Sequence, residues 1–115
     1  MSPRLNQRSL GTLLEALCLD YDRRRIAIAQ GRLSRRVLHE YRYLNDRILY
    51  AAYSVTGDTT LSQIYIREIG ERIGYAYTEV EGVSEITYKR RKALIRRRIL
   101  EELRLVDQEQ TLSLS

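Results

Sequence analysis

The sequence predicts an all-α fold of about four helices in a single domain that spans residues 1–115. Its 115 residues contain six glycines and one proline, and Pro3 lies outside every predicted element, so long stretches are free to form helix. Apolar residues recur at three- and four-residue steps in four successive segments, which is the period of an amphipathic helix. Only residues 75–83 show any strand-like alternation, so we expect any sheet to be confined to them.

The first helix is predicted to run from Ser9 to Gln30. Ser9 is a suitable N-cap, and Gly31 is a suitable stop because glycine readily adopts the left-handed conformation that ends many helices. Residues 23–25 are three arginines that fall on different sides of this helix, and we expect at least one of them to be well solvated. The apolar face consists of Leu10, Leu13, Leu14, Leu17, Tyr21 and Ile28.

The second helix is predicted between Ser34 as its cap and Gly57 as its stop, so that residues 9–57 form two long helices. Its apolar residues follow steps close to a heptad seam. This seam packs either against the first helix or against a second copy of the chain in a homodimer, and both alternatives are open. The seam consists of Val37, Tyr41, Leu44, Ile48, Ala51 or Ala52, and Val55.

The third helix is predicted to follow a turn and cap at residues 58–60 and to end at Gly74. Residues 75–83 are ambiguous between a short strand and an irregular connection, and Thr78 with Glu81 has the spacing of a capping box. The apolar side of the helix consists of Leu61, Ile64, Tyr65, Ile69 and Ile73.

The fourth helix is predicted from Ser84, its cap, to Leu105. Val83 and Tyr88 stand at the spacing of a hydrophobic staple, so we expect Tyr88 to be packed. Residues 107–115 are expected to form a frayed tail. Three further tyrosines have apolar neighbours and are expected in the core: Tyr41, Tyr65 and Tyr75.

The residue inventory argues against most catalytic sites. With one histidine, His39, and one cysteine, Cys18, the chain lacks the ligands of the usual zinc sites. It contains no glycine-rich phosphate loop, and its carboxylates are mostly flanked by arginine or lysine, as on a solvated helix face. We therefore expect a protein that is not an enzyme and uses no cofactor, metal or small-molecule substrate.

The same inventory bears on the compartment. No run approaches the ~18 apolar residues of a transmembrane helix. The first ten residues lack the apolar stretch of a signal peptide, and a single cysteine fits a reducing compartment. We expect a cytoplasmic protein with no membrane partner.

Basic charge is concentrated on the fourth predicted helix. Residues 84–104 hold eight basic and three acidic residues, a net charge of +5, which equals the excess of the whole chain. Such clustering is the electrostatic signature of a protein that binds phosphate backbones. The alternatives are a solvated arginine-rich surface helix and a membrane-surface helix. The membrane alternative is weaker because the apolar face has no tryptophan or phenylalanine.

Residues 58–105 are predicted to form a helix-turn-helix-like half, for which two registers are open. In the first, Gly70, Gly74 and Val80 are the spaced small and apolar residues of the motif. Its second helix begins near residue 77 with Thr78 as the cap. The exposed face of that helix carries carboxylates that repel phosphate, namely Glu79, Glu81 and Glu85.

In the second register, residues 61–104 resemble small phage transcriptional regulators of the RinA and ArpU type. The stretch Ser84-Glu-Ile-Thr-Tyr-Lys-Arg-Arg-Lys-Ala-Leu94 resembles their recognition helix, and Ile66–Tyr75 is similar to the preceding helix. The connection between Gly74 and Ser84 is longer than the usual turn of about three to four residues, which allows a looped or winged variant.

The resemblance implies duplex DNA as the partner, with the following contacts. Thr87, Lys89, Arg90 and Arg91 would face the DNA, where Arg or Lys can read guanine edges and Thr can contact base or phosphate. Lys92, Arg96 and Arg97 would bind phosphates. The function expected first is DNA binding by a phage or mobile-element transcriptional regulator. The alternatives are a packaging or assembly protein resembling a small terminase subunit, and a helical interaction module without nucleic acid.

Overall fold

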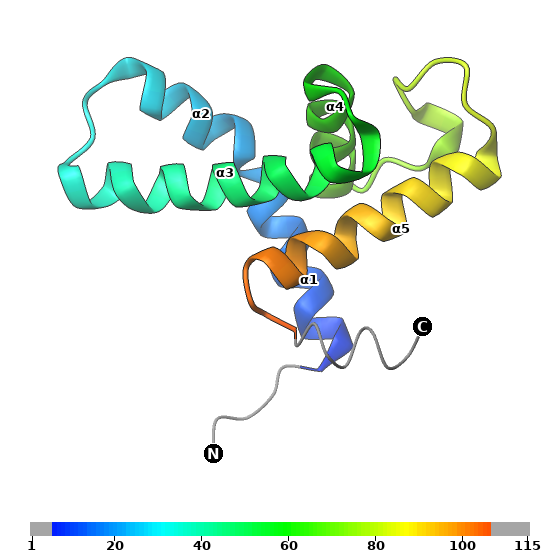
Figure 1. The fold of residues 1–115 in the computed structure, drawn as a ribbon, viewed down its shortest axis with the longest axis horizontal. Helices are drawn as coiled ribbons and strands as arrows, with labels where there is room; N and C mark the ends of the chain where they lie inside the picture. The colour runs from blue at the N-terminus through cyan, green and yellow to red at the C-terminus, as the bar shows by residue number, and fades with distance from the viewer. Residues whose placement is uncertain (1–5, 107–115) are drawn as a thin grey trace.

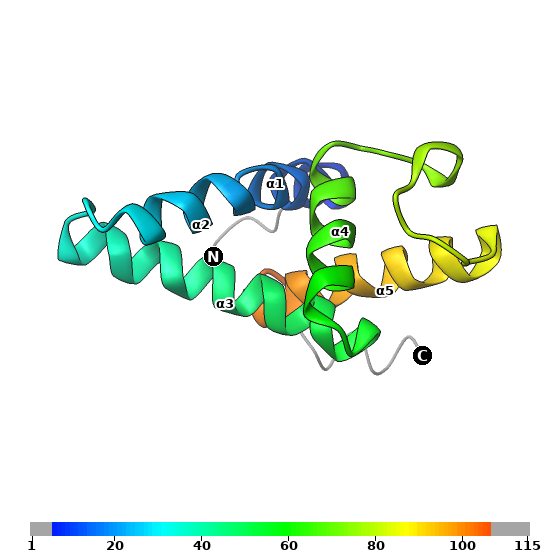
Figure 2. The same cartoon turned by 90° about the horizontal axis from the view of Figure 1, so that it is seen from above.

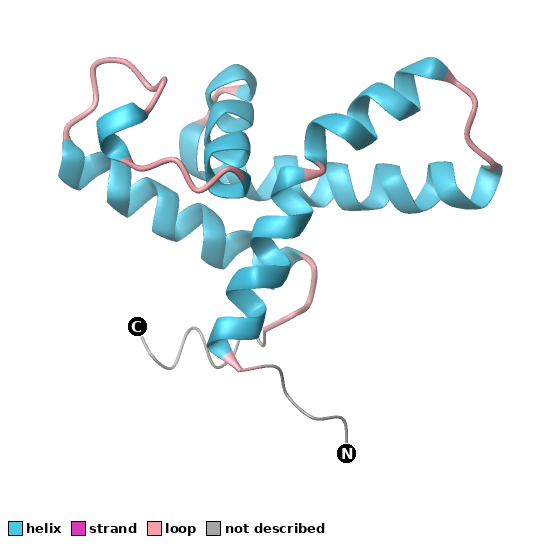
Figure 3. Cartoon of the chain, turned by 180° about the vertical axis from the view of Figure 1, so that it is seen from behind, coloured by secondary structure: helices cyan, strands magenta, loops and turns pink. Residues whose placement is uncertain are grey.

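The computed structural model describes residues 6–106, and within this range it contains helices and loops without a strand (Figures 1 and 3). The all-α prediction is therefore confirmed, and each expected helix is present, the first one divided in two. The predicted frayed tail, 107–115, lies outside the described residues. The elements are α1 (Gln7–Leu19), α2 (Tyr21–Gln30), α3 (Arg35–Thr56), α4 (Thr59–Gly70), a 3₁₀ turn η1 (Tyr75–Tyr77) and α5 (Glu85–Glu102).

The first helix begins earlier than expected, because Asn6 and not Ser9 is its N-cap and accepts from the N–H of Ser9 at 2.8 Å. The long helix expected over residues 9–30 also breaks at Asp20, because the two halves pack on different partners. α1 lies against α4, whereas α2 runs beside the first half of α3 (Figure 2). The side chain of Arg24 is buried at the break and donates from Nη2 to the carbonyl of Leu17 at 2.6 Å. Its Nε donates to Asn45 Oδ1 of α3 at 2.7 Å.

This buried polar network joins α1, α2 and α3. Asn45 completes it by donating from Nδ2 to the carbonyl of Tyr21 at 3.1 Å. A buried guanidinium is tolerated only when its donors are satisfied, which these two acceptors help to achieve. Arg23 and Arg25 are exposed, which confirms that at least one of the three arginines is solvated.

Helix α3 has the predicted ends. Ser34 Oγ accepts from the backbone N–H of Val37 at 3.4 Å, and Gly57 ends the helix with φ +70°. Along the predicted seam, Ile48, Ala51 and Ala52 are buried, and Leu44 is partly buried. Helices α4 and α5 of the same chain cover most of this face, and α2 covers its first part. The seam therefore packs within the chain, but mainly on other helices than the first one, which was the expected partner.

Helix α4 begins as predicted, with Asp58 as its N-cap, but it ends at Gly70 and not at Gly74. Arg72 adopts the left-handed conformation, with φ +57°, and the N–H of Ile73 donates to the carbonyl of Glu68 at 2.9 Å. This is the Schellman arrangement, here with arginine at the position where glycine is usual. The early ending frees the carbonyl of Ile73 for contacts with α5.

Gly70 is where α4 comes closest to the junction of α1 and α2. A Cβ placed on it would lie 2.4 Å from the backbone nitrogen of Leu19 and 2.8 Å from the carbonyl carbon of Cys18. Both neighbours are backbone atoms, which cannot move aside as a side chain can. Glycine at residue 70 is thus a requirement of helix packing.

The core lies where α3, α4 and α5 meet, and aromatic rings fill part of it. Tyr65 and Tyr88 are buried and stack with ring centroids 5.5 Å apart. Tyr75 lies at 5.8 Å from the Tyr88 ring and is partly buried, as is Tyr41. The packing expected of Tyr88 is confirmed. The apolar residues buried around these rings include Leu14, Ile48, Ile66, Ile69, Ile95 and Ile99.

We predict that Gly70→Ala lowers the free energy of unfolding by about 1–3 kcal/mol or more, because overpacking against backbone forces α4 away from Leu19. Urea denaturation measures the difference. Gly74→Ala is the matched control, since Gly74 has extended dihedral angles and no atom lies within 4 Å of the position that a Cβ would occupy there. It should change the free energy by no more than about 0.5 kcal/mol. Equal losses in the two variants would contradict the close contact at Gly70.

Candidate nucleic-acid interface

Helix α5 carries the basic residues and has one buried and one solvent-facing side. Ser84 caps it by accepting from the N–H of Thr87 at 3.2 Å, as predicted. Tyr88, Ile95 and Ile99 are buried on its inner side. The helix ends at Glu102, slightly before the predicted Leu105, and the left-handed residue that follows is Arg104, with φ +57°.

A buried carboxylate, that of Glu68, fixes α5 and the connection before it to α4. Its side chain is 0% exposed. Oε1 accepts from Thr78 Oγ1 at 2.6 Å and from Tyr88 Oη at 2.7 Å, and Oε2 accepts from the N–H of Glu79 at 2.7 Å. Three donors from two separate segments thus compensate for the loss of hydration.

Sequence reasoning missed this role, because it places Glu68 among the carboxylates of a solvated helix face. The capping box expected at Thr78 and Glu81 is also wrong. The Thr78 hydroxyl instead donates to Glu68 and accepts from the N–H of Val80 at 3.0 Å. The sequence did contain a signal for this role. Glu68 follows Tyr65 by three residues and adjoins Ile69, so it lies on the side of the helix that these two buried residues occupy.

The structure divides the predicted DNA-binding residues into two groups. Lys89, Arg90 and Arg97 are exposed, and Arg91 is partly exposed. Lys89 pairs with Glu85 across one helical turn, with Nζ and Oε1 2.9 Å apart. The remaining three residues make contacts within the chain: Thr87, Lys92 and Arg96.

Lys92 is directed inward. Its Nζ donates to the carbonyl of Ile73 and lies 5.5 Å from the centroid of the Tyr88 ring. Burial lowers the pKa of Lys92, and the neighbouring Arg96 lowers it further. Burial also raises the pKa of the Tyr88 hydroxyl, as does its hydrogen bond to Glu68, so the hydroxyl stays protonated and can donate. Lys92 therefore holds α5 against the end of α4.

Arg96 is partly buried and contacts α1. Its Nη2 lies 3.4 Å from Glu15 Oε1, and Arg72 Nε lies 2.6 Å from the other carboxylate oxygen. Burial disfavours the ionised carboxylate, but the two guanidinium groups outweigh it and lower the pKa of Glu15. Thr87 is likewise engaged, because its hydroxyl lies 2.9 Å from Ser84 Oγ within the helix cap.

The solvent-facing side of α5 is mainly basic, with Ile86 and Leu94 as its large exposed apolar residues. Between Glu85 and Glu101 the helix has no carboxylate. Arg90 and Arg97 lie two turns apart on the exposed face. Arg98 adds a third exposed guanidinium that the sequence prediction left out of the site, and its Nη1 lies 3.3 Å from Ser54 Oγ.

The path of the chain between α4 and α5 excludes the first helix-turn-helix register and differs from the standard motif in the second. The first is wrong, because residues 77–83 form no α-helix and Thr78 caps none. In the second, α5 begins at the expected place, but residues 71–84 separate it from α4. Val80 is buried, and Tyr75 Oη donates to the carbonyl of Val83 at 2.9 Å, so this connection is packed and looped. It leads from α4 to α5 without the short turn of the standard motif.

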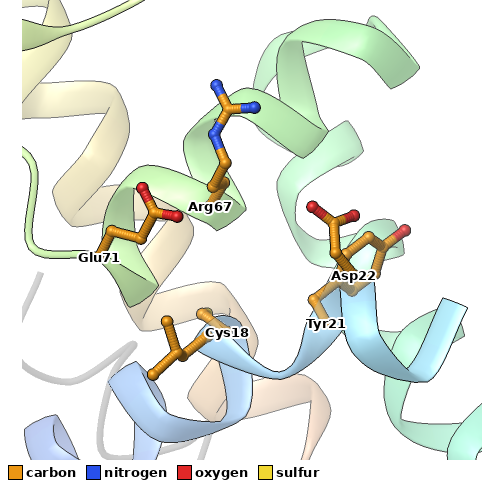
Figure 4. A pocket seen from close by; sticks show the side chains of 6 residues that line it. Cys18, Tyr21, Asp22, Arg67 and Glu71 are labelled. Carbon is orange, nitrogen blue, oxygen red and sulfur yellow. The ribbon is translucent and has the colours of Figure 1, made fainter. Parts of the chain in front are cut away.

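The one cysteine lies beside a small cavity at the junction of α1 and α2 (Figure 4). The cavity has a volume of about 40 Å³, and its lining includes Cys18, Arg67 and Glu71. Burial raises the pKa of Cys18 to about 12, so its thiol is protonated at neutral pH and is a poor nucleophile.

Comparison with known proteins gives no match for this chain, whether with family models, curated proteins or solved structures. None of the helices in the described part of the chain has both the length and the apolar stretch that a membrane crossing requires.

We predict that Tyr88→Phe lowers the free energy of unfolding by about 1.5–3 kcal/mol, because the buried carboxylate of Glu68 loses a charge-assisted hydrogen bond. Tyr65→Phe is the matched control. Within residues 6–106, Tyr65 Oη is buried without a hydrogen-bond partner. Its removal should be neutral or slightly stabilising. Urea midpoints measure both, and a larger loss for Tyr65→Phe than for Tyr88→Phe would contradict the role given to Glu68.

Proposed function

We propose that this protein binds duplex DNA through the solvent-facing side of α5. The observation that carries the proposal is a stretch without a carboxylate, residues 86–100, in which four basic side chains are exposed: Lys89, Arg90, Arg97 and Arg98. Phosphate contacts by such residues supply most of the sequence-independent affinity for DNA. Arg90 and Arg97 are the principal contacts, with Lys89, Arg91 and Arg98 beside them.

The proposed contact set is smaller than the one predicted from the sequence. Lys92 and Arg96 are partly buried and bonded to Ile73 and Glu15, so we assign them to holding α5 in place. Lys89 and Arg98 also contact neighbours within the chain, but their side chains are exposed and stay in the set. Arg90 and Arg97 stand about 10 Å apart along the helix, which lets them reach different phosphates. A role in phage or mobile-element transcription rests on the resemblance of residues 61–104, and we propose binding without catalysis.

The test is a salt titration of binding to random-sequence duplex DNA. Each neutralised phosphate contributes ~0.9 to the negative slope of log K against log salt concentration. About three to four contacts from one helix give a slope of about −2.7 to −3.6. The double variant Arg90→Ala, Arg97→Ala should flatten the slope by up to ~2 and leave the urea midpoint unchanged, because both side chains are exposed.

The matched control removes two positive charges from a part of the surface outside α5. Arg32→Ala with Arg35→Ala alters two exposed arginines at the turn between α2 and α3. This variant should keep nearly the parental slope. If it loses as much slope as the α5 variant, the interface does not lie on α5, and if the parent shows no salt-dependent binding at about 50 mM salt, the protein does not bind duplex DNA.

A role as an assembly or packaging component is the second candidate. The observation that favours it is a row of exposed tyrosines on α3: Tyr43, Tyr50 and Tyr53 are 44%, 63% and 48% exposed. Large aromatic side chains gathered on one helix face are typical of protein interfaces.

A further inference from the structure

The outer face of α3 is exposed around the middle of the helix, and α2 runs beside the first half of α3 (Figure 2). We name this face the tyrosine stripe and define it by Glu40, Arg42, Tyr43, Asp46, Arg47 and Tyr50. All six residues are exposed. They recur at three-, four- and seven-residue steps, which places them on one side of the helix, opposite the buried Ile48 and Ala52. Most of them line an open groove along the helix.

We propose that the tyrosine stripe binds a second copy of this chain, with the two α3 helices antiparallel about a two-fold axis near Tyr43. A two-fold interface uses the same patch on both copies, so the patch must complement itself. The order of charges on α3 meets this condition. Reversal of the helix about an axis near Tyr43 brings Glu40 opposite Arg47 of the other copy, and Asp46 opposite Arg42 of the other copy.

Each of these pairs occurs twice by symmetry, and the two Tyr43 rings meet near the axis. The tyrosines supply the apolar area, and the four ion pairs at the rim specify the orientation. Within one chain, Arg47 lies over the Tyr43 ring at 5.5 Å and 3.4 Å from Glu102 Oε2, with its own side chain 50% exposed. Glu40 lies 3.4 Å from Arg36 Nε in an exposed pair, and such pairs are weak. Little free energy is therefore lost when Arg47 turns toward a partner.

The same charges favour a protein over a nucleic acid at this face. Glu40 and Asp46 lie between the arginines, and their carboxylates would face the phosphates of any nucleic acid bound along the stripe. The stripe is thus nearly balanced in charge, in contrast to the solvent-facing side of α5. The inference does not depend on the DNA-binding proposal, because it uses different residues on a different helix.

Sedimentation equilibrium of nuclease-treated protein tests the proposal. The parent should be dimeric, and Arg47→Glu should weaken the dimer at least about tenfold, because it places like charges opposite each other twice. The combined change Glu40→Arg, Arg47→Glu exchanges the charges and should restore the dimer. Glu102→Gln is the control: it removes the contact between Arg47 and Glu102 within the chain, and it should leave the dimer intact.

Cysteine cross-linking tests the position of the axis. Tyr43→Cys places a thiol beside its own symmetry mate and should give a disulfide-linked dimer on oxidation. Tyr50→Cys is the control, because Tyr50 is more exposed but lies about 10 Å further along the helix, so its two copies are about 20 Å apart. The native Cys18 is buried and should not react.

A parent that stays monomeric, or that associates only when nucleic acid is added, would overturn the proposal. So would a charge exchange that fails to restore what Arg47→Glu loses, provided that circular dichroism shows both variants folded. Cross-linking at residue 50 but not at residue 43 would refute the antiparallel arrangement about Tyr43.

Discussion

The carboxylate of Glu68 is the interaction on which the arrangement of the C-terminal half depends. A fully buried carboxylate is stable only when donors replace the water that it has lost. Here the donors come from Thr78, from the backbone of Glu79 and from Tyr88, so the connection and α5 must both be in place before the charge is satisfied. Removing any one donor leaves the buried carboxylate of Glu68 with too few hydrogen bonds, so substitutions of these donors are expected to destabilise the fold. The direction in which α5 leaves the core, and with it the exposure of Arg90 and Arg97, follows from this contact.

The features predicted from the sequence were those that short stretches of chain determine. Ser34, Gly57 and Ser84 were identified correctly because a cap depends on its own backbone and on the next three residues. The break at Asp20 was missed because α1 and α2 pack on different, distant helices. The early end of α4 was missed because left-handed Arg72 ends it, where glycine is the usual signal. The site shows the same division. The sequence located the basic helix, but Lys92 and Arg96 were assigned to DNA because nothing local shows that Ile73 and Glu15 hold them.

The two proposed surfaces lie on neighbouring helices and share a border. Arg98 of α5 lies against Ser54 of α3, and Glu102 of α5 lies against Arg47 in the tyrosine stripe. A second copy that recruits Arg47 would free Glu102 near the end of α5. In a two-fold dimer, the two basic faces would also be related by symmetry, which is the arrangement that palindromic DNA sites require.

The last turn of α4 is constrained from opposite sides. Residues two positions apart on a helix point about 200° apart. Glu68 must therefore face Thr78 and Tyr88 while Gly70, on the other side, admits the backbone of Leu19. Inserting or deleting one residue within α4 would rotate this turn by about 100° and break one contact or the other. The two contacts therefore fix the register of the last turn of α4, with an acidic residue two positions before the glycine.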